Sequence, residues 1–231
     1  ALFSNLPKTS SLERISQERT EPGRTEQLYQ SRDYYYLISP QTEPVDIGFE
    51  EFRTGIKDDG LTSREPIGSF FLSTGHATHP VYFHPIRQTE SRFRYLGRQK
   101  MEQRAGRSAH VLAFAQMPTA AGMVRHLDTG DQSILILLQG IAWVDPDSFQ
   151  IYRMHTELLV PRIDAGLDYQ TTHIRFTAVK FKDIPESLYL PDEVVVSMKY
   201  KGFLFRNRHR YSQYRLFSVE SQDGPKVIAR P

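Results

Sequence analysis

The chain has 231 residues and a formal net charge of +2, so its length allows one or two domains and its charge alone does not favour a polyanion partner. Hydrophobic residues make up 39% and charged residues 24%, the composition of an ordinary soluble protein. The longest aliphatic run, Ile134 to Leu138, is far shorter than the roughly 20 residues that a membrane-spanning helix needs. The absence of cysteine excludes disulfides, thiolate nucleophiles and cysteine-ligated zinc.

The ends and the internal composition of the chain indicate one domain. The sequence begins at Ala1 without a methionine and shows no signal-peptide pattern, so we expect a processed or truncated chain. No repeat of fixed period occurs, and the Pro- and Gly-containing stretches are short enough to be turns rather than linkers. We therefore expect a single domain over residues 1–231.

Segments rich in Val, Ile, Tyr, Phe and Thr, separated by Gly, Pro or Asp, predict successive antiparallel strands. The predicted strands are 11–20, 30–39, 47–56, 91–103, 107–117, 133–144, 149–160, 170–182, 192–201 and 203–219. One helical piece is predicted at Ile67 to His79, where Pro66 precedes a cluster of apolar residues. The chain is therefore predicted to be mainly β with few helices.

The segment from Gly140 to His155 has the pattern of a β-hairpin. Its centre, Asp145-Pro146-Asp147-Ser148, suits a type I turn. If Val144 pairs with Phe149, side chains of both strands form one apolar face. That face contains Leu135, Leu137, Ile141, Trp143, Tyr152, Met154 and Leu158. The other face mixes apolar and charged residues. A register slip of one residue would exchange the face assignments on one strand. In either register, apolar residues remain on both faces.

Later strands also carry apolar residues on both faces, and they add Phe176, Val196 and Met198 to the predicted apolar lining. A sheet with two apolar faces needs cover on both, and the sequence after Arg92 offers few helices to supply it. We therefore expect a curved sheet that surrounds a central apolar space. The stretch from Ile67 to Pro85 is the candidate cover, with Phe70, Phe71 and Leu72 as lid residues.

The hairpin resembles that of a known family. Trp143-Val144-Asp145 before the turn and Ile151-Tyr152-Arg153 after it are similar to a hairpin of the bacterial lipoprotein-localisation (LolA/LolB-like) superfamily. The stretch from Tyr95 to Pro118 resembles the neighbouring strand pair of the same family. The continuation from Leu167 to Val219 is similar to a larger branch of the superfamily.

The resemblance implies an unclosed antiparallel half-barrel covered by helices or loops, whose interior holds the acyl chains of lipid-anchored proteins. It also implies a place in the periplasm or at the outer membrane, a chain peripheral to the membrane at most, and no catalysis. The family's arginine on an early strand has three candidates here, Arg14, Arg19 and Arg32.

Two other patterns suggest different chemistry. Lys201-Gly202-Phe203-Leu204-Phe205, followed by arginines, partly copies an RNA-recognition strand, but the helix and strand layout of that module is missing. His76, His79 and His84 have the side chains for a metal site, but no carboxylate or cysteine lies close in sequence. We therefore expect neither a nucleic-acid partner nor a metal.

The usual sequence motifs of enzymes and of nucleotide binding are absent. The chain contains no nucleophile elbow, zinc-protease, phosphate-loop or dinucleotide motif, so we expect neither an enzyme nor a cofactor. The favoured hypothesis is a cell-envelope domain that binds a lipid or the acyl chains of a lipoprotein, with an envelope protein as a further possible partner. The alternative is a sensing or scaffolding domain whose half-barrel is filled by its own side chains.

Overall fold

The computed structural model describes residues 7–43, 46–57, 62–63, 75–100, 108–119, 125–128, 133–182 and 184–217. Its first strands are β1 (Thr9–Thr20), β2 (Gln27–Glu43), β3 (Asp46–Ile56), β4 (Thr62–Ser63), β5 (Ser91–Lys100) and β6 (Ser108–Gln116). The later strands are β7 (Arg125–Asp128), β8 (Ser133–Ile136), β9 (Leu138–Val144), β10 (Ile151–Leu158), β11 (Leu167–Val179), β12 (Leu188–Tyr200) and β13 (Phe203–Leu216). Three short 3-10 helices complete the elements: η1 (His79–Phe83), η2 (Pro85–Arg87) and η3 (Ile163–Ala165).

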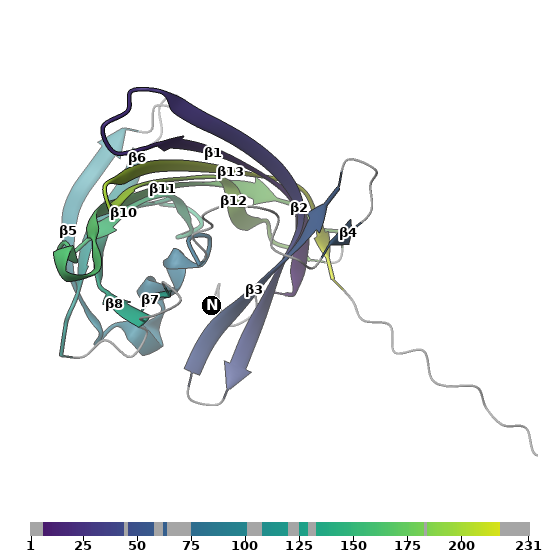
Figure 1. Ribbon diagram of the computed structural model, residues 1–231. Coiled ribbons are helices and arrows are strands. Elements are labelled where there is room, and N and C mark those ends of the chain that lie inside the picture. The colour runs from purple at the N-terminus through teal and green to yellow at the C-terminus, as the bar shows by residue number, and fades with distance from the viewer. Residues whose placement is uncertain are drawn as a thin grey trace, which may run out of the picture.

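Eleven strands form one antiparallel sheet in the order β4-β3-β2-β1-β13-β12-β11-β10-β9-β6-β5, and β7 pairs with β8 in a separate sheet. The large sheet bends into an arch, and the segment of η1 and η2 lies inside it (Figure 1). Its two outer strands, β4 and β5, are not paired with each other. The predicted fold, an unclosed antiparallel half-barrel, is confirmed.

The main differences from the predicted strands lie near β8. The predicted strand 133–144 is two strands, because the chain leaves the small sheet after Ile136 and enters the large sheet at Leu138. The short strands β4 and β7 were not predicted, since two and four residues are too few to show an alternating pattern. No helix among the described residues is long and apolar enough to cross a membrane.

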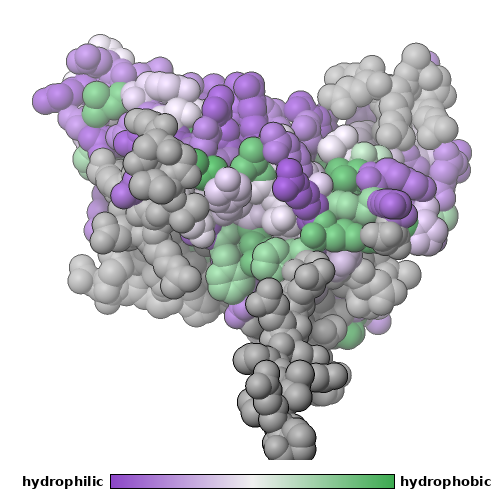
Figure 2. All heavy atoms as spheres, turned by 90° about the vertical axis from the view of Figure 1, so that its right-hand side faces the viewer, coloured by the Kyte–Doolittle hydropathy of each residue, from purple (hydrophilic) through white to green (hydrophobic). Residues whose placement is uncertain are grey.

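Alternation along the strands separates a buried concave face from a polar convex face. Along β1, alternate residues from Thr9 to Gln17 are buried, while Arg14 between them is exposed. The convex side, which is the top of the arch, is hydrophilic, and hydrophobic side chains gather below it (Figure 2). Across the described residues the sheet as a whole therefore does not have the predicted second apolar face, although Ile141 and Trp143 of the β9–β10 hairpin stand on the convex side.

The β9–β10 hairpin shows how that error arose. Val144 pairs with Ile151, not Phe149, and a bulge lies between Ile151 and Arg153. Arg153 then stands opposite Trp143, and Met154 stands opposite Ala142. A bulge inserts one unpaired residue and so reverses the side on which the following residues point. Val144, Ala142 and Met154 consequently share the concave face, while Trp143 and Ile141 are on the convex face.

The concave core is closed by the segment before β5. Ala77, Val81 and Tyr82 of this segment belong to the same buried cluster as Met154 and Met198 of the sheet. The helical turn over 79–83 is a 3-10 helix with Pro80 in its first turn. It begins at the residue where the predicted helix ends. The remainder of the predicted helix, 67–74, lies outside the described residues, as do the lid candidates Phe70, Phe71 and Leu72.

Candidate functional site: an apolar cavity beside a buried ion cluster

A cavity of about 430 Å³ lies between the concave sheet and the covering segment. Its walls are mainly apolar. They come from strands at both ends of the sheet and from the covering segment. The wall residues include Ile38, Phe49, Ala77, Phe83, Leu112, Val144, Phe149, Ile151, Phe176 and Leu190. Its volume lies in the range of roughly 300 to 1,000 Å³ that is typical of small-molecule pockets.

The β9–β10 hairpin forms one wall of the cavity, and its turn is stabilised by hydrogen bonds to an aspartate. Asp145 Oδ1 accepts hydrogen bonds from the backbone N–H groups of Asp147 and Ser148, each at 3.0 Å. Asp145 is buried, so these bonds satisfy its carboxylate within the turn. The expected turn role of this aspartate is therefore what the structure shows.

Gly140 allows three strands to approach one another closely behind this wall. It pairs with Phe114 of β6 and with Thr156 of β10. A Cβ atom at this position would lie 2.1 Å from the carbonyl oxygen of His155 and 3.0 Å from the Phe114 ring. Only glycine fits there, because no other residue lacks a Cβ atom.

The residues predicted to line an apolar space divide between the two faces. Phe176 is a wall residue of the cavity, and Met154, Leu158, Val196 and Met198 belong to the concave core. The others do not join this core: Leu135 is exposed, Leu137 and Ile141 are partly buried, and Trp143 and Tyr152 line a groove of about 310 Å³ elsewhere. The bulge of β10 is the cause, since it separates Trp143 from Met154.

Trp143, the sole tryptophan, is held on the convex face by polar neighbours. Its ring nitrogen donates to Gln99 Oε1 at 2.7 Å, and the guanidinium of Arg153 lies 4.6 Å from its ring centroid. The stacked arginine and the satisfied N–H group are a structural environment for an indole on a sheet surface. These contacts explain the position of the Trp143 ring, which therefore does not need to contact an acyl chain.

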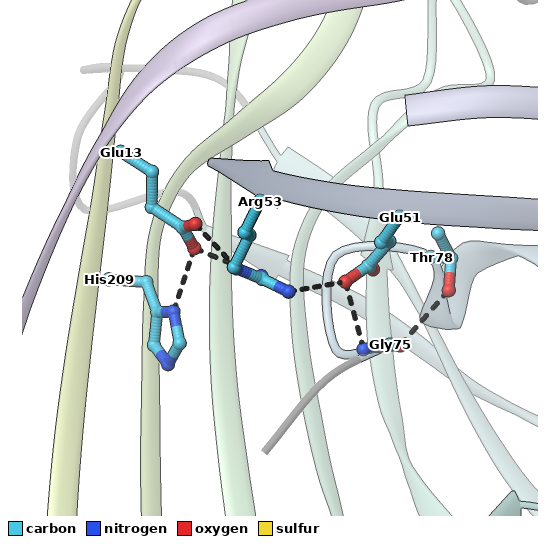
Figure 3. Close-up of polar contacts among 6 residues, drawn as sticks. All are labelled: Glu13, Glu51, Arg53, Gly75, Thr78 and His209. Atoms are coloured by element: carbon cyan, nitrogen blue, oxygen red, sulfur yellow. Dashed lines mark hydrogen bonds and ion pairs between the residues drawn. The ribbon is translucent and has the colours of Figure 1, made fainter. Parts of the chain in front are cut away.

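The concave face also contains a buried cluster of charged side chains that the sequence did not indicate (Figure 3). Arg53 of β3 forms two hydrogen bonds with Glu13 of β1, at 2.6 and 3.1 Å. His209 of β13 places its Nδ1 atom 2.8 Å from the same carboxylate. The side chains of Glu13 and His209 are 0% and 1% exposed. Three strands are therefore joined by one buried carboxylate.

The ion cluster extends to the covering segment through Glu51 (Figure 3). Arg53 Nη1 lies 3.2 Å from Glu51 Oε2, and the backbone N–H of Gly75 donates to the same oxygen at 3.0 Å. Thr78 Oγ1 in turn donates to the carbonyl of Gly75 at 3.0 Å. The start of the covering segment is thus fixed to the sheet by charge-assisted hydrogen bonds.

Charge pairing sets the ionisation of this cluster. Burial on its own would raise the pKa of Glu13, but Arg53 and the hydrogen bonds from Arg53 and His209 lower it to about 2. Burial also opposes the charge of Arg53, but Glu13 holds the Arg53 pKa well above its ordinary value. The ring of Tyr36 lies under the guanidinium, with its centroid 4.7 Å away. Glu13 and Arg53 are therefore a charged pair throughout the physiological pH range.

The three candidate metal-ligating histidines have separate partners. His79 Nδ1 lies 3.3 Å from Thr156 Oγ1, and His76 Nδ1 lies 3.2 Å from Thr172 Oγ1. His84 accepts a hydrogen bond from the backbone N–H of Ile86 at 3.2 Å. Among the described residues, no group of three or more His, Asp or Glu side chains is arranged to hold a metal ion. Two of the histidines instead connect the covering segment to β10 and β11.

The RNA-like stretch forms a turn and an ordinary strand. Lys201 and Gly202 have φ of +48° and +82° and make the tight turn between β12 and β13. Phe205 is buried in the core, which removes it from any exposed stacking surface. Arg206, Arg208 and Arg210 lie on the convex side and form ion pairs with Glu18 and Glu193.

Sequence reasoning missed Glu13, Arg53 and His209, and it proposed other early arginines. Arg14 and Arg32 are exposed, and Arg19 forms an ion pair with Glu21 at 2.9 Å. Arg53 of β3, which was not among these candidates, has a mostly buried side chain. The available signal was the alternation in β1, where the residues that point inward include Ser11, Glu13 and Gln17 and are thus mostly polar. An alternation rule assigns the polar positions of a strand to the solvent side. In β1 these polar positions are buried, so the rule places them on the wrong face.

No family model and no curated protein sequence matches the chain. Among solved structures it is similar to a DUF1329 family protein from Desulfovibrio piger, with 9% identity, a TM-score of 0.48, and coverage of 95% of this chain and 89% of that chain. It is also similar to a domain from Vibrio parahaemolyticus described as an outer membrane lipoprotein-sorting protein domain. There the identity is 11% and the TM-score 0.42, with coverage of 92% of this chain and 87% of that chain.

A third similar structure is a LolA superfamily protein from Nitrosomonas europaea, with 14% identity and a TM-score of 0.36. The match covers 91% of this chain and 87% of that chain.

Proposed function

We propose that this protein binds the acyl chain of a lipid or of a lipid-anchored protein in the apolar cavity of its half-barrel, as a non-catalytic carrier of the bacterial cell envelope. The single observation that carries the proposal is the cavity of about 430 Å³ with mainly apolar walls. Each buried methylene group contributes about 0.8 kcal/mol, so part of an acyl chain suffices for useful affinity after the cost of ordering it.

The lining supports an apolar ligand more than a polar one. Ile38, Leu112 and Phe176 present hydrocarbon to the cavity. The charged residues Glu13 and Arg53 are not among the wall residues, and each already has its charged partner. Polar side chains are the minority of the lining, and two of them, His84 and Gln150, already hydrogen-bond within the protein. Burying polar groups of a ligand there would therefore be unfavourable.

The covering segment supports a carrier because it forms part of the cavity wall. Ala77 and Phe83 contribute to the wall, and Gly75 of the same segment is bound to Glu51. Entry and release of an acyl chain need a cover whose open and closed states differ by only a few kcal/mol. The cover is also packed into the core through Val81 and Tyr82, so release would involve the part of the segment around Gly75 and Ala77 more readily than the buried 3-10 turn.

The proposal is tested by filling the cavity. Leu112 is only partly buried and faces the cavity, so Leu112→Trp places an indole in the space of the ligand. The matched control is Ile141→Trp, a partly buried position on the convex face of β9. We expect Leu112→Trp to lose binding of a fluorescent fatty acid at least tenfold and Ile141→Trp to keep it.

Native mass spectrometry of the purified protein supplies a second measurement. A bound lipid in the unmodified protein that is absent in Leu112→Trp supports the carrier. If neither protein binds fatty acid or retains a lipid, while both unfold cooperatively, the carrier proposal is wrong. The scaffold with a self-filled half-barrel is then the better description.

A further inference from the structure

The outer edge of β5 combines exposed apolar and basic side chains in one strand. Phe93, Tyr95 and Leu96 are 38%, 55% and 51% exposed. Arg92, Arg94, Arg98 and Lys100 are exposed on the same ten-residue strand, which contains no acidic residue. Among the described strands, β5 is the last of the sheet and is bonded to β6 alone. We call residues 92–100 the β5 edge.

The cations of the β5 edge have no carboxylate partner within the described part of the chain. None of its four basic residues forms an ion pair there, whereas the nearby Arg87 is paired with Glu90 at 3.0 Å. Basic residues elsewhere on the sheet are mostly paired, as Arg210 is with Glu193. Among the described residues the edge is therefore a local concentration of positive charge without paired carboxylates.

The β5 edge adjoins the wall of the cavity. The Phe93 ring lies 5.3 Å from the ring of Phe83, a wall residue. Tyr95 stands opposite Leu112, another wall residue, and its hydroxyl lies 3.1 Å from His110 Nδ1. The exposed apolar side chains and the apolar cavity are thus separated by a single layer of side chains.

Pairing with another strand does not explain this edge. A bulge between Tyr95 and Gly97 interrupts its regular backbone, and Gly97 has φ of +102°. Bulges and basic residues are the devices by which edge strands avoid pairing, and a second copy would bring a second set of cations. A bulge and basic residues prevent strand pairing without any exposed Phe, Tyr or Leu, so the exposed Phe93, Tyr95 and Leu96 need another explanation. The apolar residues therefore indicate a partner that is not a strand.

We propose that the β5 edge docks on the surface of a bilayer that contains anionic phospholipids. Phe93 and Tyr95 point to the concave side and Arg92 and Arg94 to the convex side, so the strand would meet the bilayer along its free edge. The Lys and Arg side chains would then face the phosphate groups, and the apolar side chains would enter the interfacial region, where aromatic residues are favoured. The choice of a lipid surface rests on the proposed function, because it places the acyl-chain cavity beside its source or destination. The exposed aromatic and leucine side chains beside the cations favour a lipid interface over an acidic protein segment, and the interrupted edge disfavours an added strand.

The test is flotation of the full chain with vesicles of phosphatidylcholine alone and of phosphatidylcholine mixed equally with phosphatidylglycerol. We expect binding to the mixed vesicles only, and we expect it to weaken with added salt, which screens these attractions. The double variant Arg94→Gln, Arg98→Gln should bind about 25-fold more weakly, at about fivefold for each cation removed. The matched control is Arg206→Gln, Arg210→Gln, which removes the same charge from the convex side of β13 and should bind normally.

A second pair of variants tests the apolar contribution. Leu96→Asp on the β5 edge should abolish flotation, while Leu204→Asp, at a similarly exposed position on β13, should not. Equal losses in the edge variants and their controls, or binding that does not depend on phosphatidylglycerol, would overturn the docking proposal. So would capture of an acidic protein in place of the vesicles.

The two proposals fail separately. A protein that floats with anionic vesicles but binds no fatty acid keeps the docking surface and loses the carrier function. A protein that binds fatty acid but ignores both kinds of vesicle keeps the cavity and loses the docking surface.

Discussion

The concave interior has two halves of opposite chemistry on one continuous sheet. Under β9 to β12 it is built from aliphatic and thioether side chains such as Met154 and Val196. Under β1, β3 and β13 it contains Glu13, Arg53 and His209. Apolar packing has no direction, whereas each buried charge must meet a particular partner. The first half can therefore adapt to different contents, and the second fixes the relative positions of the strands and the cover.

The comparison predicts that conservative changes in the polar half are severe. Glu13→Gln leaves the shape almost unchanged but removes the nearer of the two carboxylates that pair with buried Arg53, at 2.6 Å, and leaves it with Glu51 at 3.2 Å. Breaking a buried pair from one side costs about 3 to 5 kcal/mol, so the free energy of unfolding in urea should fall by that amount. Replacing both residues, Glu13→Gln with Arg53→Met, should cost less than the single change. A smaller loss in Glu13→Gln than in the double variant would contradict a charged pair.

The apolar half should respond to lost volume but not to altered shape. Met154 is fully buried, so Met154→Ala should lower the free energy of unfolding by about 2 to 5 kcal/mol through the cavity that it leaves. Met154→Leu keeps the volume and should cost less than about 1.5 kcal/mol. Chemical unfolding of both variants decides the matter. Equal losses would mean that this half is as specific as the ion cluster.

Acid should weaken the polar half selectively. The Glu13 pKa is lowered from 4.5 to about 2, so its stabilisation is fully present above pH 4.5 and is lost as the pH falls towards 2. The loss is on the order of 3 kcal/mol in the free energy of unfolding. Urea unfolding at a series of pH values should show this decline in the natural sequence and a shallower decline in Glu13→Gln. Parallel curves would remove Glu13 as the cause.

The smallest effect is expected on the convex face. Arg14 and Asp33 form a two-pronged ion pair at 2.7 and 2.8 Å, and both side chains are largely in solvent. Because water and salt screen exposed pairs, Arg14→Ala should leave the unfolding midpoint unchanged within error. A clear shift would show that the convex surface also holds the sheet together.

The sequence predicted successive antiparallel strands because apolar, β-branched segments separated by turn residues are typical of them, and the resemblance of the hairpin residues supplied the half-barrel. It did not predict the faces of the β9–β10 hairpin, since one unpaired residue near Tyr152 reverses them and leaves no pattern of its own. It also did not predict the ion cluster. Glu13, Arg53 and His209 are far apart in the chain, and only the pairing of β1 with β13 and the curvature of β2 and β3 bring them together.

The open seam of the sheet has a mechanical consequence. Among the described strands, β4 and β5 form the two free margins, and no ladder hydrogen bond joins them. The margins can separate or approach by a change of twist alone, with every interstrand bond retained. The girth of the half-barrel is therefore a soft coordinate, in contrast to that of a closed barrel, where the number of strands and their stagger set the radius.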